Sequence, residues 1–379
     1  MNGQATVLAQ YDFDSVQDLS GDFIGTLENG AELIPYGNNS ILSLGNNDGY
    51  FNFGSYFGTI ISQLDNFSIS TNLLISSSYQ ISGLGNFVWT FANSTNMAAT
   101  ANGNIFFGAN RSRYTISKTN YTSESSIVID NTLLTGQWIN LTYTQFNGIG
   151  KIYINGNLEV QGPIAVTPKE LGATPYNFLG RSCYSGDKYL KTAQYDNFIV
   201  YNGELNQTEI STLTEAISPL NDVLNTNILA NASEALIIPN ADAIKSNLIL
   251  NTIGNDGVTI SWASSNTNVI TTTGVVTRPA IGLNPVNLTL TATLQLNDNV
   301  LIKTFDVTVI PLYSDAESVQ MDLDNLALSG NTANIRDAIQ LPIKTEEGTM
   351  VVWTSDAPDY LNNIGKVQQL SPFGNGKKE

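Results

Sequence analysis

Along most of the chain, apolar residues occupy every second position, which is the pattern of β-strands. In the segments 138–144 and 286–294, the positions between the apolar ones are mostly asparagine and threonine. This alternation predicts strands with one buried and one exposed face. Asn-Gly pairs interrupt the pattern, and Asn155-Gly156 stands between two strand-like runs of the segment 151–160. Because Asn-Gly favours a tight two-residue turn, this segment is predicted to form a β-hairpin.

A helical pattern follows the strands, directly after Asn206. Asn206 and Glu209 have the spacing of a capping box. The next apolar residues share one face of a helix: Ile210, Leu213 and Ile217. Pro219 comes soon afterwards, so we expect a short helix, then a linker, and a domain border between residues 214 and 215.

The C-terminal part contains an internal repeat. Segments 259–265 and 350–356 both carry a tryptophan at their fourth position, and Trp262 and Trp353 are 91 residues apart. The same offset relates four further pairs: Leu250 and Leu341, Gly257 and Gly348, Gly274 and Gly365, Val276 and Val367. A period of about 90 residues is the size of one immunoglobulin-like sandwich, and both tryptophans are expected to be buried.

The second copy of the repeat is shorter than the first. Copy one continues past Gly274 into the strand 286–294 and a closing strand 305–309, whereas copy two reaches Glu379 soon after Gly365. It therefore lacks roughly 30 residues of a sandwich of about 90. We expect either that the natural protein continues beyond Glu379 or that the gene product is truncated. The predicted domains are 1–214, 215–312 and a partial domain 313–379.

Charge and rare residues narrow the possible functions. The chain of 379 residues has 16 Lys and Arg against 33 Asp and Glu, a net charge of −17. This field repels phosphate backbones, which argues against nucleic-acid binding and suits neutral ligands or divalent cations. No apolar run approaches the roughly 18–20 residues of a membrane helix. Histidine is absent and Cys183 is the single cysteine, which excludes Ser-His-Asp and Cys-His catalysis, His-containing zinc sites and an intrachain disulfide.

Seven short segments follow one another in a recognisable order: 18–27, 49–54, 67–70, 137–143, 152–156, 179–182 and 195–202. With these segments, the stretch of about residues 5–214 resembles the laminin-G and concanavalin-like jelly rolls that bacteria append to secreted carbohydrate-active enzymes. The segment 260–279, with Trp262, Gly274 and Arg278-Pro279, resembles the atrophied bacterial Ig-like domain. The resemblance implies an all-β fold, namely a jelly-roll sandwich, then an Ig-like β-sandwich and a partial second Ig-like repeat.

The two resemblances together imply a function, because modules of these two kinds occur beside the catalytic domains of certain enzymes. Such modules accompany family 43 and related arabinan- or xylan-directed glycoside hydrolases. We expect a non-catalytic, carbohydrate-binding and spacer region of a secreted bacterial enzyme, with the catalytic domain beyond residue 379. The alternative is a cell-surface adhesion or structural protein built from the same domains. Both place the chain outside the cell, with a polysaccharide or glycan as partner.

One loop carries residues suited to binding a sugar. A sugar stacks its C–H face on an aromatic ring, while its hydroxyls need directional polar partners. The segment 181–189 offers both in Arg181, Tyr184, Asp187 and Tyr189. Tyr114, Tyr121 and Trp89 are further aromatic candidates, although Trp89 and Trp138 fit a core position better. No Glu-x-Asp-x-x-Glu strand, the mark of jelly-roll glycosidases, is present.

An acidic cluster near the N-terminus suggests a structural calcium ion. Asp12, Asp14, Asp18 and Asp22 supply the oxygen ligands that Ca²⁺ prefers. In the resembled family a calcium ion lies between this loop and the last strand, and Asp18 and Asp196 occupy the matching positions. The family has a second aspartate after the latter, where this chain has Asn197. The competing interpretations are a solvated acidic loop and the edge of an N-terminal strand.

Overall fold

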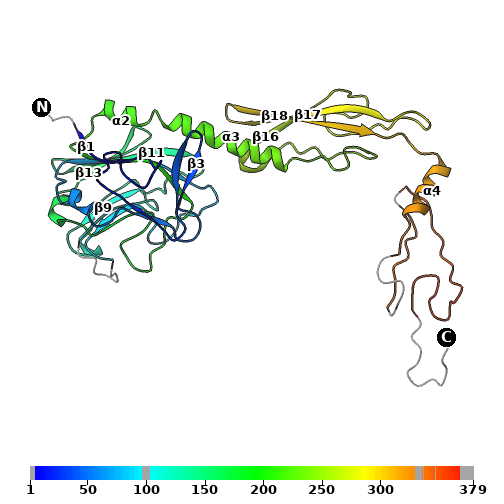
Figure 1. The fold of residues 1–379 in the computed structure, drawn as a ribbon, viewed down its shortest axis with the longest axis horizontal. Helices are drawn as coiled ribbons and strands as arrows, with labels where there is room; N and C mark the ends of the chain where they lie inside the picture. Colours follow the sequence, from blue (N-terminus) through cyan, green and yellow to red (C-terminus); the bar gives the residue numbers. More distant parts are fainter. Residues whose placement is uncertain (1–4, 96–102, 329–334, 336, 346, 368–379) are drawn as a thin grey trace, which may run out of the picture. The chain divides into compact units, whose positions relative to one another are not determined.

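The computed structural model describes residues 5–95, 103–328, 335, 337–345 and 347–367. Contacts divide the chain into two compact units, Met1–Ile228 and Leu229–Glu379. Strands make up most of the regular secondary structure described in both units (Figure 1), which confirms the all-β fold class. The predicted domain borders at 214 and 312 stay predictions. No helix of the described residues is long and apolar enough to span a membrane.

The first unit is a sandwich of two antiparallel sheets. The eight-stranded sheet contains, in order, β13 (Asn157–Pro163), β12 (Ile149–Ile154), β11 (Trp138–Phe146), β6 (Phe67–Ile75), β15 (Ala193–Asn202), β4 (Asn39–Ser43) and β3 (Glu32–Tyr36), with β1 (Thr6–Tyr11) beside β15. The seven-stranded sheet contains β10 (Ser125–Val128), β9 (Arg113–Ser117), β8 (Asn104–Gly108), β7 (Phe87–Ala92), β14 (Tyr176–Leu179), β5 (Tyr50–Asn52) and β2 (Thr26–Glu28). Three short helical turns connect strands: α1 (Gly58–Ile61) and the 3₁₀ turns Tyr121–Ser123 and Pro168–Leu171.

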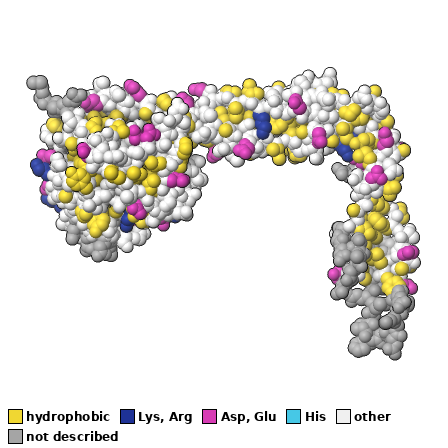
Figure 2. Space-filling model, in the orientation of Figure 1, with side chains coloured by type: hydrophobic (Ala, Val, Ile, Leu, Met, Phe, Trp, Pro, Cys, Tyr) yellow, Lys and Arg dark blue, Asp and Glu magenta, His cyan; other side chains and the backbone are white. Residues whose placement is uncertain are grey.

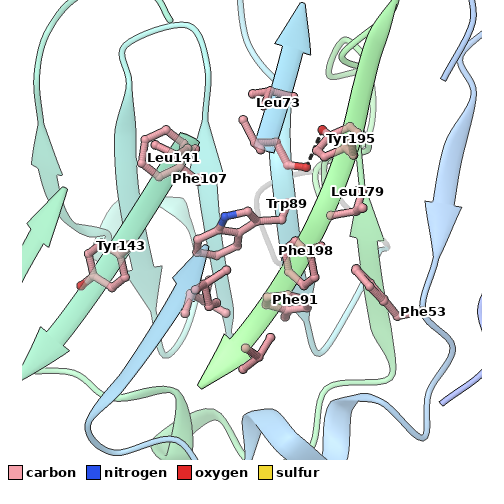
Figure 3. Packing of buried hydrophobic residues seen from close by; sticks show 14 of the residues in the cluster. Phe53, Leu73, Trp89, Phe91, Phe107, Leu141, Tyr143, Leu179, Tyr195 and Phe198 are labelled. Carbon is pink, nitrogen blue, oxygen red and sulfur yellow. Dashed lines mark hydrogen bonds between the residues drawn. The ribbon is translucent and has the colours of Figure 1, made fainter. Parts of the chain in front are cut away.

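Aromatic side chains fill the space between the two sheets (Figure 3). Trp89 and Phe91 of β7 stack with ring centroids 5.5 Å apart. The rings of Tyr114 and Tyr143, from opposite sheets, stack at 3.6 Å. The buried hydroxyl of Tyr195 donates a hydrogen bond of 2.8 Å to the carbonyl of Val88. Trp89 is 1% exposed, so its predicted core position is confirmed.

The hairpin predicted around Asn155-Gly156 is confirmed by β12 and β13, which pair on either side of it. Asn155 has φ +50° and Gly156 has φ +79°. Two successive positive φ angles define the turn type that Asn-Gly favours, because its twist matches that of the flanking strands.

The half-exposed strand predicted for 138–144 is wrong, because both faces of β11 are buried. Ile139, Leu141 and Tyr143 face the core between the sheets. The opposite face is covered by α2 (Gln207–Leu213) and by the beginning of α3 (Ile217–Ala235), which lie over the eight-stranded sheet (Figure 1). Helix residues pack here on Tyr36, Trp138 and other outward side chains of the sheet.

The linker predicted after the short helix is also wrong. The capping box is present as expected, since the Asn206 side chain accepts from the N–H groups of Thr208 and Glu209. After a break of three residues, however, the chain re-enters a helix, α3. Pro219 lies in the first turn of α3, where its missing N–H costs nothing because those N–H groups have no helical partner.

The second unit contains a three-stranded antiparallel sheet of β16 (Thr259–Ser264), β17 (Val286–Leu296) and β18 (Asn299–Val309). The 3₁₀ turn Asn255–Gly257 precedes the sheet and α4 (Asp315–Asn325) follows it. One face of the sheet packs on apolar loop residues, among them Ile244 and Ile270. The Lys303 ammonium donates to the carbonyls of Ser233 and Leu236, at 2.6 and 2.8 Å, and so caps the C-terminal end of α3.

The repeat predicted from the 91-residue offset is confirmed by equivalent contacts. The indole N–H of Trp262 donates to the carbonyl of Asn251 at 2.9 Å, and that of Trp353 donates to the carbonyl of Pro342 at 2.7 Å. Both tryptophans were expected to be buried, but both side chains are only half-buried. The second copy pairs no strand like β17 with its tryptophan segment among the described residues up to 367.

Candidate functional site

A shallow cavity of about 510 Å³ lies beside the loop that connects β14 to β15. The loop contributes half-exposed and exposed side chains, among them Asp187 and Tyr189. The rest of the lining comes from segments far away in the sequence. The cavity residues are Asp48, Tyr79, Gln80, Gly186, Asp187, Lys188, Tyr189 and Lys191.

Backbone contacts hold this loop in place. Residue 188 bridges to Gly85 in a parallel pairing, and its carbonyl accepts from the N–H of Asn86 at 2.8 Å. Gly85 has φ +87°, and a Cβ there would approach the carbonyl oxygen of Lys188 to 2.3 Å. Only glycine permits this close approach. The Tyr79 hydroxyl lies within hydrogen-bond distance of both Asn86 Oδ1 and the carbonyl of Tyr189, at 2.6 and 2.9 Å.

The cavity mixes donors, acceptors and tyrosine rings in a small space. Asp187 Oδ2 accepts from the hydroxyl of Ser182 at 2.7 Å, and burial raises the pKa of the Asp187 carboxyl above its usual range. The Lys191 ammonium pairs with Asp48 at 2.9 Å, while Lys188 Nζ donates to Ser82 Oγ at 3.0 Å. Acidic and basic groups balance, so the cavity suits a neutral, hydroxyl-rich ligand better than an ion.

Two of the four residues predicted from the loop lie outside the cavity lining. The Arg181 guanidinium stacks over the rings of Tyr50 and Phe178, at 4.7 and 4.6 Å. The Tyr184 hydroxyl donates to Glu124 Oε1 at 3.0 Å and accepts from the Asn104 amide at 2.9 Å. Both side chains therefore hold the loop against the outer face of the seven-stranded sheet.

Burial decides which of the remaining aromatic candidates could contact a ligand. Tyr114 is fully buried and Trp89 nearly so, and neither reaches the surface, whereas Tyr121 is 54% exposed on its 3₁₀ turn. Cys183 is buried as well, and burial raises the pKa of its thiol to about 12, which makes it a poor nucleophile. Sequence reasoning missed Asp48, Tyr79 and Gln80, because no motif links them to the loop around residue 187.

A second cavity, of about 430 Å³, lies on the outer face of the eight-stranded sheet. Its lining includes three carboxylates, from Asp12, Asp14 and Asp196, and the amides of Gln10 and Asn197. Asp196 Oδ2 accepts from the Asn197 amide at 2.8 Å and from the Asn72 amide at 3.1 Å. Burial, together with the charges of the two other aspartates, raises the pKa of Asp196.

The predicted calcium pair does not share this cavity. Asp18 directs its carboxylate into its own turn, where it accepts from the Ser20 hydroxyl at 2.5 Å and from the N–H of Phe23 at 2.9 Å. Asp18 is absent from the cavity lining in which Asp196 stands. Within the described residues, no group of three or more acidic or thiol side chains has the arrangement of a metal site. Calcium binding at Asp18 and Asp196 stays a prediction.

Thermal unfolding tests that prediction. If a calcium ion binds at Asp196, millimolar Ca²⁺ raises the Tm of the full chain and a chelator lowers it, because a ligand of the native state stabilises it by mass action. Asp196→Asn abolishes the shift, whereas Asp65→Asn, at an exposed acidic position, leaves it intact. Equal Tm values for the wild-type chain with Ca²⁺ and with chelator would contradict the prediction.

Two family models match separate parts of the chain. Residues 46–211 match the model of the concanavalin A-like lectin/glucanases superfamily, and residues 229–312 match that of the atrophied bacterial Ig domain. The first match covers the sandwich from β5 onward, without the strands before residue 46, and the second covers the three-stranded sheet of the second unit. Both matches confirm the resemblances. No curated protein matches the chain.

Several solved structures are similar at low identity. Domain 4 of AbnA, a family 43 extracellular arabinanase from Geobacillus stearothermophilus in complex with arabinotriose, is 16% identical with a TM-score of 0.45, and the match covers 56% of this chain and 99% of that domain. Trypanosoma rangeli sialidase is 15% identical with a TM-score of 0.41, over 57% of this chain and 33% of the sialidase. The botulinum neurotoxin serotype D/C binding domain is 15% identical with a TM-score of 0.42, over 79% and 78%. At such similarity, the ligands of those proteins say nothing about this chain's ligand.

Proposed function

We propose that the first unit binds a neutral saccharide in the cavity of Asp187 and Tyr189. The observation that carries the proposal is the composition of this cavity, which combines tyrosine rings with balanced donors and acceptors. A sugar needs both kinds of contact, and small-molecule sites combine aromatic side chains with a small number of precisely placed polar groups. The match of residues 46–211 to a lectin-containing superfamily supports the same class of ligand.

The setting of this binding unit is a polysaccharide-degrading system outside the bacterial cell. There the chain serves as the accessory region of an arabinan- or xylan-directed glycoside hydrolase and does no chemistry itself. Tethering raises the concentration of substrate near a catalytic domain, which increases the rate without new catalytic groups. A nucleic-acid ligand does not suit the surface, since the face drawn in Figure 2 carries scattered Asp and Glu and few Lys or Arg side chains.

Glycan-array binding followed by calorimetry tests the proposal. The full chain is expected to bind neutral plant or host oligosaccharides, and Tyr189→Ala and Asp187→Ala each weaken that binding about tenfold, or about 1.4 kcal/mol. Tyr176→Ala is the matched control, because Tyr176 is 38% exposed and lies outside the cavity lining. Binding that all three variants reduce equally, or no binding to any glycan, would refute the proposal.

A further inference from the structure

The guanidinium of Arg181 is held against two aromatic rings beside the saccharide cavity. Its central carbon lies 4.7 Å from the ring centroid of Tyr50 and 4.6 Å from that of Phe178. The two rings meet edge to face, with their centroids 5.4 Å apart, and Phe178 is only 3% exposed. Attraction of a guanidinium to the face of a ring uses none of its five N–H donors. The rings therefore fix the position of the group and leave its donors for other partners.

Arg181 differs from the other arginines of the first unit in having no acidic partner. Arg111 pairs with Asp130 at 2.8 Å. Arg113 pairs with Glu124 at 3.1 Å. Arg181 makes no ion pair within the described part of the chain, although the sequence has 33 acidic residues against 16 basic ones. Carboxylates are the groups that the fork of a guanidinium binds best, so its donors suit a carboxylate that a ligand brings.

Glu28 is the acidic residue that the sheet places beside this site. Strands β2 and β5 pair Glu28 with Tyr50. The Glu28 carboxylate accepts from the hydroxyl of Thr26 at 2.8 Å and lies outside ion-pair distance of Arg181. Burial raises the pKa of the Tyr50 hydroxyl, an effect that the charge of Arg181 opposes and that of Glu28 reinforces. Both charges thus act on the same hydroxyl without forming an ion pair.

The ring of Tyr50 connects Arg181 with the cavity. Its centroid lies 5.9 Å from that of Tyr189, which lines the cavity. Tyr50 and Arg181 are both half-buried, so each keeps part of its surface open to a ligand. The charges inside the cavity are balanced, since Lys191 pairs with Asp48. A saccharide that fills the cavity and continues past Tyr189 therefore meets an arginine without an ion-pair partner at its next unit.

We propose that the ligand of the first unit is an acidic oligosaccharide, in which a neutral sugar occupies the cavity and the neighbouring unit presents a carboxylate to Arg181. This inference rests on the proposed function, because Arg181 acts on the unit next to the cavity. The pairing of a guanidinium with a carboxylate is bidentate and about twice as strong as a hydrogen bond between neutral groups. The rings of Tyr50 and Phe178 already hold the guanidinium in place, so its binding loses little side-chain entropy.

Calorimetry with matched pairs of oligosaccharides tests the proposal. Each pair consists of an acidic oligosaccharide and its derivative in which the carboxyl is reduced to a hydroxymethyl group. The pairs are prepared from glucuronoxylan, from pectin and from a sialylated oligosaccharide, so that the source of the sugar acid is also distinguished. In at least one pair, the acidic member is expected to bind the full chain about tenfold more tightly. This ratio should fall as NaCl is raised, because salt screens a half-exposed ion pair.

Three variants test whether Arg181 causes the preference. Arg181→Gln removes the charge and should bring the ratio of acidic to neutral affinity to about one. Arg181→Lys keeps the charge but loses the planar fork, so a smaller ratio of about threefold should remain. Arg111→Gln is the matched control, because Arg111 is exposed, pairs with Asp130 and lies outside the cavity lining. It should keep the wild-type ratio. Since each ratio is measured within one variant, a displaced loop that lowers both affinities does not change it.

The outcomes distinguish this inference from the proposed function. Equal binding of both members in every pair would overturn the inference and leave the proposed function standing. A tenfold ratio that survives in Arg181→Gln would overturn it as well, since Arg181 would then only hold its loop in place. Binding of neither member in any pair would refute the proposed function and the inference together.

Discussion

Gly274→Ala is expected to destabilise the second unit by about 3 kcal/mol, a large effect for the addition of one methyl group. Gly274 has φ +84°, and a Cβ at this position would lie 2.3 Å from the carbonyl oxygen of Leu248. The positive φ alone costs an alanine about 1–2 kcal/mol. The clash adds to that cost, because its partner is backbone and the N–H of Leu248 donates to the carbonyl of Gly274. Relief of the clash therefore strains that hydrogen bond.

Gly282→Ala is the matched control in the same unit. Gly282 has φ +79°, but no atom lies within 4 Å of the place that a Cβ would occupy. Its substitution by alanine therefore costs only the free energy of holding a non-glycine residue at a positive φ. Urea unfolding of the full chain, with hydrogen exchange of residues 244–309 to assign the change to the second unit, measures both. An equal loss of unfolding free energy in the two variants would show that the clash between the Cβ at position 274 and the Leu248 carbonyl contributes nothing to the destabilisation.

The sequence identified Gly274 as a repeated position but could not supply the physical reason. The offset of 91 residues paired it with Gly365, and the structure gives both a positive φ and a close backbone oxygen, from Leu248 and Ile339. Repetition of a glycine signals a backbone requirement of some kind. Which carbonyl approaches it depends on a contact between segments some 26 residues apart, and no local pattern encodes that contact.

The candidate site was predictable only where its residues are neighbours in the chain. Asp187 and Tyr189 belong to one loop whose composition indicated a polar and aromatic surface. Tyr79 and Asp48 reach the same cavity because the loop bridges to the turn around Gly85 and pairs Lys191 with Asp48. Strand order in an antiparallel sandwich creates such neighbours, and a single sequence does not state that order.

The buried outer face of β11 shows a different kind of failure. Period-two alternation distinguishes two faces of a strand but does not say whether the second face meets water or another element. The covering element did leave a signal, since Ile217, Leu220 and Leu224 recur at helical spacing. Pro219 led to a linker being expected there, although proline is compatible with the first turn of a helix. The cluster between α3 and the sheet confirms the helical pattern.

Trp138→Ala is expected to destabilise the first unit by about 3–5 kcal/mol. The Trp138 side chain is 1% exposed, on the sheet face that α3 covers. Its indole N–H donates to the Tyr36 hydroxyl at 2.8 Å, and that hydroxyl in turn donates to the carbonyl of Leu220 at 3.0 Å. Truncation to alanine therefore leaves a cavity beneath α3 and removes the indole N–H that donates to the Tyr36 hydroxyl. Urea unfolding of the full chain measures the loss, and hydrogen exchange of residues 217–224 locates it.

Trp138→Phe separates packing from the hydrogen bond in that prediction. Phenylalanine keeps most of the apolar volume against the Tyr36 ring, whose centroid lies 5.6 Å from that of Trp138, but it cannot donate. We expect it to cost about 1–2 kcal/mol, mainly from the polar group left without its partner. The side chain of Asn221 still bonds the N–H and the carbonyl of residue 138 in every variant, at 2.9 and 3.2 Å, so α3 keeps one anchor on β11. Exchange in 217–224 should accordingly accelerate in the order wild type, Trp138→Phe, Trp138→Ala. Unchanged exchange there, with a loss of stability spread over the core between the sheets, would contradict the assignment of Trp138 to the attachment of α3.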